Sequence, residues 1–143
     1  MKKTLLAIST ALGLAGAAHA EDTPNLLTIL ASGEPQTQLM SMVLSMQSMQ
    51  QGAETRILLC GPAGDLALKD APTSATAPQK PRGMSPQGLM QQIMANGATV
   101  EVCAIYLPNK GVGTDALLDG ITAAAPPEMA ALLLAPNTRI MSF

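Results

Sequence analysis

Aromatic side chains are almost absent from this sequence. It contains one tyrosine, Tyr106, one phenylalanine, Phe143, and no tryptophan. Single-stranded nucleic acids are commonly held by stacking on aromatic side chains, and the chain offers no such platform. Apart from Lys2 and Lys3, its 8 basic residues are unclustered, and they are outnumbered by 10 acidic ones. A nucleic-acid surface needs concentrated positive charge. We therefore expect no nucleic-acid partner.

Histidine is also scarce, because the only one is His19. It lies in a segment with the features of a secretory signal peptide: two lysines at the start, an apolar run over 5–18, and small residues around Ala20. The apolar run is shorter than the roughly 18 residues that a membrane-spanning helix needs. We expect cleavage after Ala20, a periplasmic location, and no membrane association after cleavage.

Removal of residues 1–20 would leave a single domain over 21–143, a normal size for one hydrophobic core. The mature chain would keep 8 − 2 = 6 basic residues against 10 acidic ones. It would contain no imidazole, which excludes Ser-His-Asp and Cys-His hydrolases and zinc sites with histidine ligands. Two cysteines, the methionines and scattered carboxylates and hydroxyls remain for chemistry.

Short apolar runs alternate with helical patterns along the mature chain. We expect strands over 25–30, 56–60, 99–107, 121–124 and 138–143. We expect helices over 36–51, from Pro86 to Asn96-Gly97 with Ser85 as N-cap, over 115–119 and over 127–134, and a helical turn at 65–68 within an irregular 61–83 segment. Such alternation predicts an α/β protein with a parallel sheet covered by helices on both faces.

Cys60 and Cys103 both fall at or near the carboxyl ends of predicted parallel strands. That edge is where α/β proteins bind ligands and collect active residues. Lys110 follows Cys103, and a nearby ammonium would favour the nucleophilic thiolate. Burial as small apolar side chains is the alternative, and for Cys60 the two interpretations are equally supported.

A disulfide between the two cysteines is another interpretation. The predicted compartment is oxidising and the number of cysteines is even. Neighbouring strands, about 4.8 Å apart, could bring the two Cα atoms within bridging range, whereas an intervening strand would prevent it. Sulfurs at bonding distance would favour the disulfide, and a separation of several ångströms with an open pocket would favour sulfur chemistry.

The methionines raise the question of copper, because thioether and thiolate ligands suit Cu(I). Met42, Met46 and Met49 follow the spacing of a helix core, which is the ordinary use of methionine. Met40 falls off that stripe. We expect no metal and no other cofactor. The Gly61–Gly64 loop lacks the remaining residues of a nucleotide-binding motif.

The segments VEVCAIYLPNKG, LLDGI, PPEMAALL and RIMSF, with ILLCGPAGDLAL before them, resemble the DsrE/DsrF-like family of sulfur-handling proteins, in an exported branch. The resemblance covers about 25–143. It implies a three-layer α/β/α fold with a mostly parallel five-stranded sheet, assembly into oligomers, and a persulfide carried on a cysteine after the third strand. Cys103 matches that cysteine, and the family's strand order places Cys60 near it.

The sequence therefore predicts a periplasmic persulfide carrier or sulfurtransferase-like protein, and a homo-oligomer. Cys103 would hold the sulfur, Lys110 would favour its thiolate, Gly61–Gly64 could supply backbone N–H donors, and Cys60 could resolve the persulfide or lock Cys103 in a disulfide. The rival interpretation is a non-enzymatic binding or assembly module with a structural Cys60–Cys103 disulfide. The sulfur donor and acceptor cannot be read from the residues.

Overall fold

The computed structural model describes residues 23–143. The predicted signal peptide over 1–20 and its cleavage site lie outside the described residues. Within 23–143, no helix is both long enough and apolar enough to cross a membrane.

A parallel sheet forms the centre of the described chain. Its strands are β1 (Asn25–Leu30), β2 (Glu54–Leu59), β3 (Thr99–Val102), β4 (Thr122–Ala123) and β5 (Thr138–Ser142). They lie in the order β4-β3-β2-β1-β5, and each pairing between these five strands is parallel. The predicted five-stranded α/β sheet is confirmed, and β2 and β3 are neighbours.

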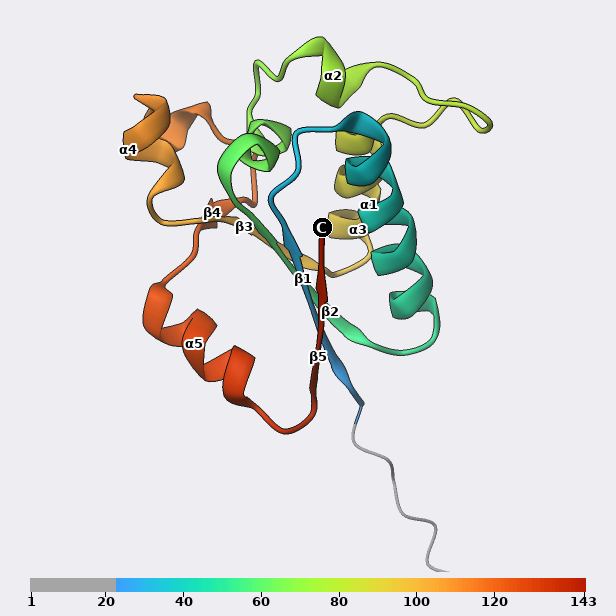
Figure 1. Cartoon of the computed structure of the whole chain (residues 1–143), viewed down its shortest axis with the longest axis vertical. Helices are drawn as coiled ribbons and strands as arrows, with labels where there is room; N and C mark the ends of the chain where they lie inside the picture. The colour runs from blue at the N-terminus through green and yellow to red at the C-terminus, as the bar shows by residue number, and fades with distance from the viewer. Residues whose placement is uncertain (1–22) are drawn as a thin grey trace, which may run out of the picture.

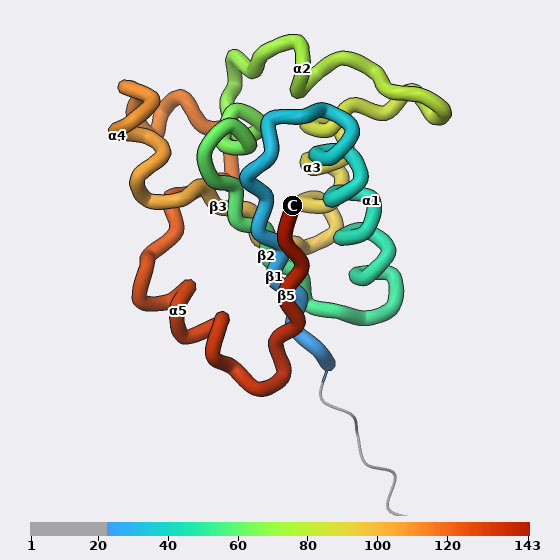
Figure 2. Tube along the Cα trace, viewed as in Figure 1, coloured from blue at the N-terminus to red at the C-terminus, as the bar shows by residue number. Residues whose placement is uncertain are grey.

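Helices cover both faces of this sheet and make three layers (Figure 1). The elements are α1 (Pro35–Gln50), the 3₁₀ helix η1 (Gly61–Ala67), α2 (Thr73–Thr76), α3 (Pro86–Ala95), α4 (Tyr106–Lys110), the 3₁₀ helix η2 (Thr114–Ala116) and α5 (Pro126–Leu134). The long helices α1 and α3 lie side by side on one face, while α5 covers part of the other (Figure 1, Figure 2). The two faces are therefore unequally covered.

The main core lies on the α1 and α3 face. Leu30, Ile57, Leu59 and Met42 are fully buried there. One polar contact sits within this layer, because the hydroxyls of Thr28 and Ser45 are 2.9 Å apart and satisfy each other. Met42 is a core side chain, as its helical spacing predicts.

The α5 face holds a smaller core. Its buried cluster consists of Leu27, Leu58, Ala124 and Met129. Half-buried side chains pack around this cluster, and both cysteines are among them.

Element boundaries differ from the sequence expectation mainly after β3. The predicted strand over 99–107 ends at Val102, and the chain turns because the Tyr106 N–H donates to the Cys103 carbonyl over 2.8 Å. α4 follows and is capped at its C-terminal end by Gly111, which has a φ of 74° that favours glycine. The predicted helix over 115–119 is the shorter η2. The Ser85 N-cap is confirmed, since its hydroxyl accepts from the Gly88 N–H.

Candidate functional site

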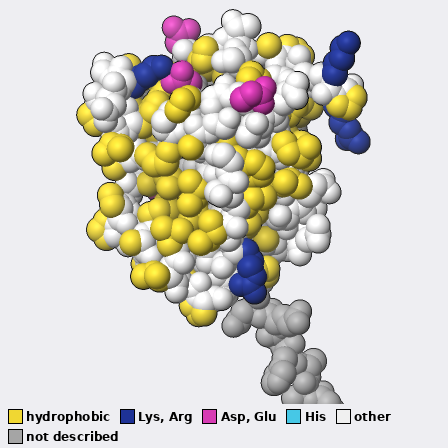
Figure 3. Space-filling view, in the orientation of Figure 1, with side chains coloured by type: hydrophobic (Ala, Val, Ile, Leu, Met, Phe, Trp, Pro, Cys, Tyr) yellow, Lys and Arg dark blue, Asp and Glu magenta, His cyan; other side chains and the backbone are white. Residues whose placement is uncertain are grey.

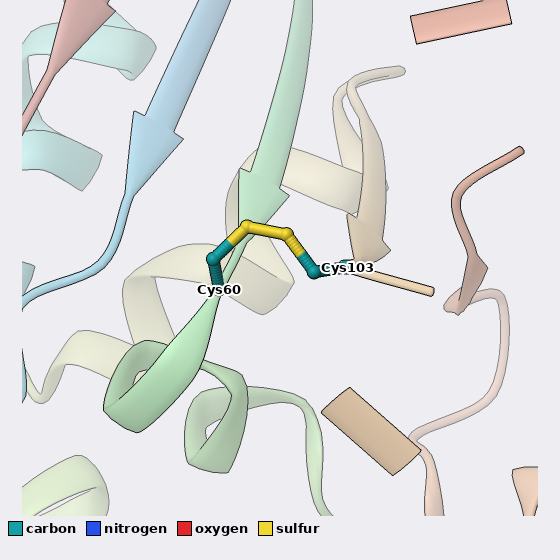
Figure 4. Close-up of a disulfide and its surroundings, with 2 residues drawn as sticks. All are labelled: Cys60 and Cys103. Atoms are coloured by element: carbon teal, nitrogen blue, oxygen red, sulfur yellow. A yellow bond between two sulfur atoms is a disulfide. The ribbon is translucent and has the colours of Figure 1, made fainter. Parts of the chain in front are cut away.

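The two cysteines occupy equivalent positions at the carboxyl ends of β2 and β3. Leu59 pairs with Val102 in the register of these strands, so the next residue on each strand, Cys60 and Cys103, lies opposite the other. Their Cα atoms are 5.1 Å apart, and the two sulfurs form a disulfide (Figure 4). That separation lies within the range that disulfides require. The register of the sheet thus brings the two cysteines within bridging range, and neither strand has to be displaced.

The disulfide belongs to the α5 face of the sheet. Both cysteines are half-buried and pack against the Leu27 and Met129 cluster. Side chains alternate between faces along a strand, so Cys60 shares this face with Leu58, two residues earlier. The cysteines therefore stand at the border between a small core and the edge where α/β proteins place their chemistry.

A surface pocket of about 550 Å³ lies beside this border. Its walls are the two segments that directly follow the cysteines, η1 after Cys60 and α4 after Cys103. It is lined by Gly61, Pro62, Asp65, Ile105, Tyr106, Asn109 and Lys110. Neither cysteine lines it, so the disulfide adjoins the pocket rather than forming its floor.

Asp65 is the polar centre of this pocket. Its Oδ1 accepts a hydrogen bond from the Tyr106 hydroxyl at 2.6 Å and one from the Lys110 ammonium at 2.7 Å. These bonds join η1 to α4 across the pocket. The Lys110 ammonium is thus paired with a carboxylate, and its effect on the Cys103 thiolate stays a prediction.

Asp65 and Tyr106 are residues that sequence reasoning did not select as site residues. Tyr106 packs closely over Gly64, since a Cβ at position 64 would overlap the ring. The one signal available in the sequence was the uniqueness of Tyr106, three residues after Cys103. Its partner Asp65 is 41 residues away in the chain, so only the fold reveals the contact.

The environment of Tyr106 gives a direct test of this pocket. Burial raises the pKa of Tyr106, and the hydrogen bond to Asp65 and the negative charge of Asp65 raise this pKa further. The fold therefore favours the neutral phenol, and this contribution to stability is present at neutral pH and lost as the pH rises above the ordinary tyrosine range.

Alkaline titration followed by tyrosinate absorbance should show this shift without ambiguity, because the chain has only one tyrosine and no tryptophan. We expect a midpoint above that of the unfolded chain. Asp65→Asn should lower it only part of the way, because the burial remains. A midpoint equal to that of free tyrosine in the folded protein would contradict the Tyr106–Asp65 contact.

Met40 lies elsewhere. It lines a groove of about 490 Å³ between α1 and the turn over 79–84, on the side of the sheet opposite α5. The structure therefore does not bring Met40 and Cys103 together as a copper site would require. Within residues 23–143, no group of three or more His, Cys, Asp or Glu side chains is arranged to hold a metal ion.

Known structures resemble this chain in fold. YchN from E. coli is 20% identical with a TM-score of 0.66, over 85% of this chain and 99% of its own. MTH1491 from Methanobacterium thermoautotrophicum, a protein of unknown function, is 13% identical with a TM-score of 0.59, over 85% and 100%. BT1422 from Bacteroides thetaiotaomicron, also of unknown function, is 21% identical with a TM-score of 0.55, over 82% and 94%.

These structural similarities show that the chain has a DsrE-like fold, and they show no activity for it. No family model matches the sequence, and no curated protein matches it. The expected fold class is thus confirmed, while the sulfur chemistry has to be argued from the site.

Proposed function

We propose that the mature chain is an exported sulfur carrier in which Cys103 holds a persulfide and Cys60 resolves it. The observation that carries the proposal is the register pairing of the two cysteines at the carboxyl edge of the sheet. In this proposal the disulfide is the closed state of the site. It opens when an external dithiol donates two electrons and two protons, giving two thiols and an oxidised dithiol.

The sulfur step then starts from the reduced pair. The Cys103 thiolate attacks the terminal sulfur of a polysulfide, and the adjacent sulfur–sulfur bond breaks with its electron pair on the shortened polysulfide. An acceptor thiolate can take the outer sulfur and leave Cys103 as a thiolate. Alternatively, the Cys60 thiolate attacks the Cys103 sulfur, which reforms the disulfide and releases hydrosulfide. The 5.1 Å Cα separation supports this second route, because resolution needs no strand movement.

A structural disulfide in a non-enzymatic binding or assembly module is the second candidate. Two observations favour it. The sulfurs are bonded, which is the separation expected of the disulfide interpretation rather than of an open sulfur-transfer site. The bond also packs against the Leu27 and Met129 cluster and is absent from the pocket lining. The two candidates predict different responses of the disulfide in the folded protein to a reductant. A structural bond should resist a mild dithiol at neutral pH, whereas a carrier must open under the same conditions.

Intact mass spectrometry after polysulfide treatment tests the carrier. Cys60→Ser leaves the Cys103 thiol without a resolving partner, so we expect one stable added sulfur per chain on this variant. The wild-type protein, reduced first, should gain less sulfur and return to the disulfide with release of sulfide. Cys103→Ser should gain none.

Circular dichroism of each serine variant controls for folding. Equal sulfur addition to Cys60→Ser and Cys103→Ser would contradict the assignment of Cys103. Absence of added sulfur on a folded Cys60→Ser variant would exclude the carrier and leave the structural disulfide.

We propose also that the protein works in the periplasm and as a homo-oligomer. Its location can be tested by fractionating cells that express the full precursor.

A further inference from the structure

Helix α1 carries apolar side chains on its exposed side. Three of its four buried residues are polar, and Met42 is the fourth. Met40, by contrast, is 51% exposed and Val43 is 37% exposed. A helix that only covers a sheet has the opposite distribution, with its apolar side buried. The packing of the described chain therefore does not account for the apolar outer side of α1.

Part of this outer side forms one wall of a groove. The groove has a volume of about 490 Å³, and its other wall is the turn over 79–84 (Figure 1, Figure 2). Gln36, Leu39, Met40 and Val43 line it from α1, and their spacing of three and four residues places them on one stripe of the helix. The half-buried Met84 lines it from the turn. A mainly apolar lining and a volume of this size are typical of small-molecule sites.

The turn adds two positive charges to the apolar lining. Two backbone hydrogen bonds of 2.8 Å close it, from the Gln79 N–H to the Met84 carbonyl and from the Gly83 N–H to the Gln79 carbonyl. Lys80 and Arg82 lie within this closed turn, are exposed, and line the groove. Figure 3 shows basic side chains beside hydrophobic ones at the upper right, where Figure 1 places the turn.

Carboxylates of the described chain do not neutralise these two cations. The ion pairs within residues 23–143 involve three other basic residues, and neither Lys80 nor Arg82 is among them. Among the described residues, those that line the groove include no acid. Glu34 stands just before α1, but its carboxylate caps that helix and accepts from the Thr37 N–H at 2.7 Å. A bound anion could therefore pair with both cations without displacing an internal partner.

The lining and the charges together identify the occupant. An aliphatic body would match the apolar wall, and an anionic head would match Lys80 and Arg82. An anionic membrane is a poorer match, because proteins that recognise membranes by charge use clusters of about four to eight basic residues. The predicted mature chain also carries a net negative charge, which opposes approach to such a surface.

We propose that this groove binds one free single-chain amphiphile with an anionic head. Lys80 and Arg82 hold the head, while Leu39, Met40 and Val43 contact the alkyl chain. Methionine suits this contact because its flexible thioether adapts to apolar ligands of irregular shape. The inference goes beyond the proposed sulfur chemistry, since the groove shares no residue with the pocket beside the disulfide.

Methyl NMR of the mature protein with labelled methionine tests the groove, and decanoate is the probe. We expect decanoate to shift the methyl signals of Met40 and Met84, whereas those of the fully buried Met42 and Met90 should change little. The Kd should lie between roughly 10 µM and 1 mM, as expected for a ligand with about twelve non-hydrogen atoms.

Three variants and a matched control locate the binding. Lys80→Gln and Arg82→Gln should each raise the Kd about tenfold, because each removes one charged partner of the head. Met40→Gln should raise it by a similar factor, about tenfold, because it replaces an apolar contact with a polar side chain. Arg139→Gln is the control, since Arg139 is also exposed and unpaired in the described ion pairs but lies outside the groove. We expect its Kd to equal that of the wild type.

Outcomes of three kinds would overturn the inference. One is the absence of any shift at Met40 and Met84 at millimolar decanoate. Another is equal weakening by Arg82→Gln and Arg139→Gln, because decanoate would then respond to overall charge. The third is binding to phosphatidylglycerol vesicles without binding to decanoate, which would make the groove a membrane contact. Persulfide addition to Cys103 should be the same in all variants, so this inference and the sulfur proposal can fail separately.

Discussion

Reduction of the Cys60–Cys103 disulfide is expected to lower the free energy of unfolding by about 4 kcal/mol. The bond closes a loop with a sequence separation of 43, and the chain-entropy relation gives about that value for a loop of this length. For a domain of this size, the midpoint of thermal unfolding should fall by roughly 10 to 20 °C. Denaturant unfolding of the mature protein with and without a reductant measures the difference.

The double variant Cys60→Ser/Cys103→Ser is the control for this measurement. It should be about as unstable as the reduced wild type, and its stability should not respond to reductant. If the reduced and oxidised proteins unfold at the same denaturant concentration, the bond does not constrain the unfolded chain. A large loss would not by itself exclude a carrier, because the same bond can stabilise the closed state of a working site. Persulfide formation on Cys60→Ser separates these roles.

The disulfide also shows how far sequence reasoning could reach. Apolar runs of β-branched and aliphatic residues located β1, β2 and β5, and their alternation with helices predicted a parallel sheet. The order of the strands came from the family resemblance and not from the residues. Cys60 and Cys103 could be paired only once β2 and β3 were known to be neighbours, because their separation along the chain says nothing about register.

The pocket beside the disulfide was less accessible to prediction. The apolar character of 99–107 favoured one long strand, since propensity alone does not reveal that pairing with the short strand β4 ends at Val102. The chain turns there into α4, which brings Tyr106 and Lys110 to Asp65. Lys110 was singled out from its nearness to Cys103 in sequence, and the side chain that it contacts comes from η1. Contacts between distant loops depend on the finished fold, so local pattern could not supply them.

A second large effect is expected at an ion pair on the α5 face. Glu101 of β3 is opposite Leu58 in the sheet, and its side chain is only 9% exposed. Arg56 Nε lies 3.4 Å from the Glu101 Oε2 atom, and this oxygen has no hydrogen bond within the described residues. The carboxylate therefore depends on Arg56 for charge compensation in a largely apolar environment.

Removal of Arg56 and removal of Glu101 should therefore have unequal effects on the free energy of unfolding. Arg56→Leu leaves a buried carboxylate without its cation, and we expect a loss of about 3 kcal/mol in the free energy of unfolding. Glu101→Leu removes the buried charge itself and adds an aliphatic side chain beside Leu58, so we expect a change within about 1 kcal/mol. The arginine that this second variant leaves behind is 32% exposed and can be hydrated.

Urea unfolding at neutral pH of the two single variants and of the double variant Arg56→Leu/Glu101→Leu measures this asymmetry. The double variant should recover most of the stability that Arg56→Leu loses, because the uncompensated charge is gone. Equal losses in both single variants, or a double variant less stable than either, would show that the pair contributes net attraction. In that case the ion pair itself would raise the free energy of unfolding. We expect instead that Arg56 mainly offsets the cost of burying the Glu101 carboxylate.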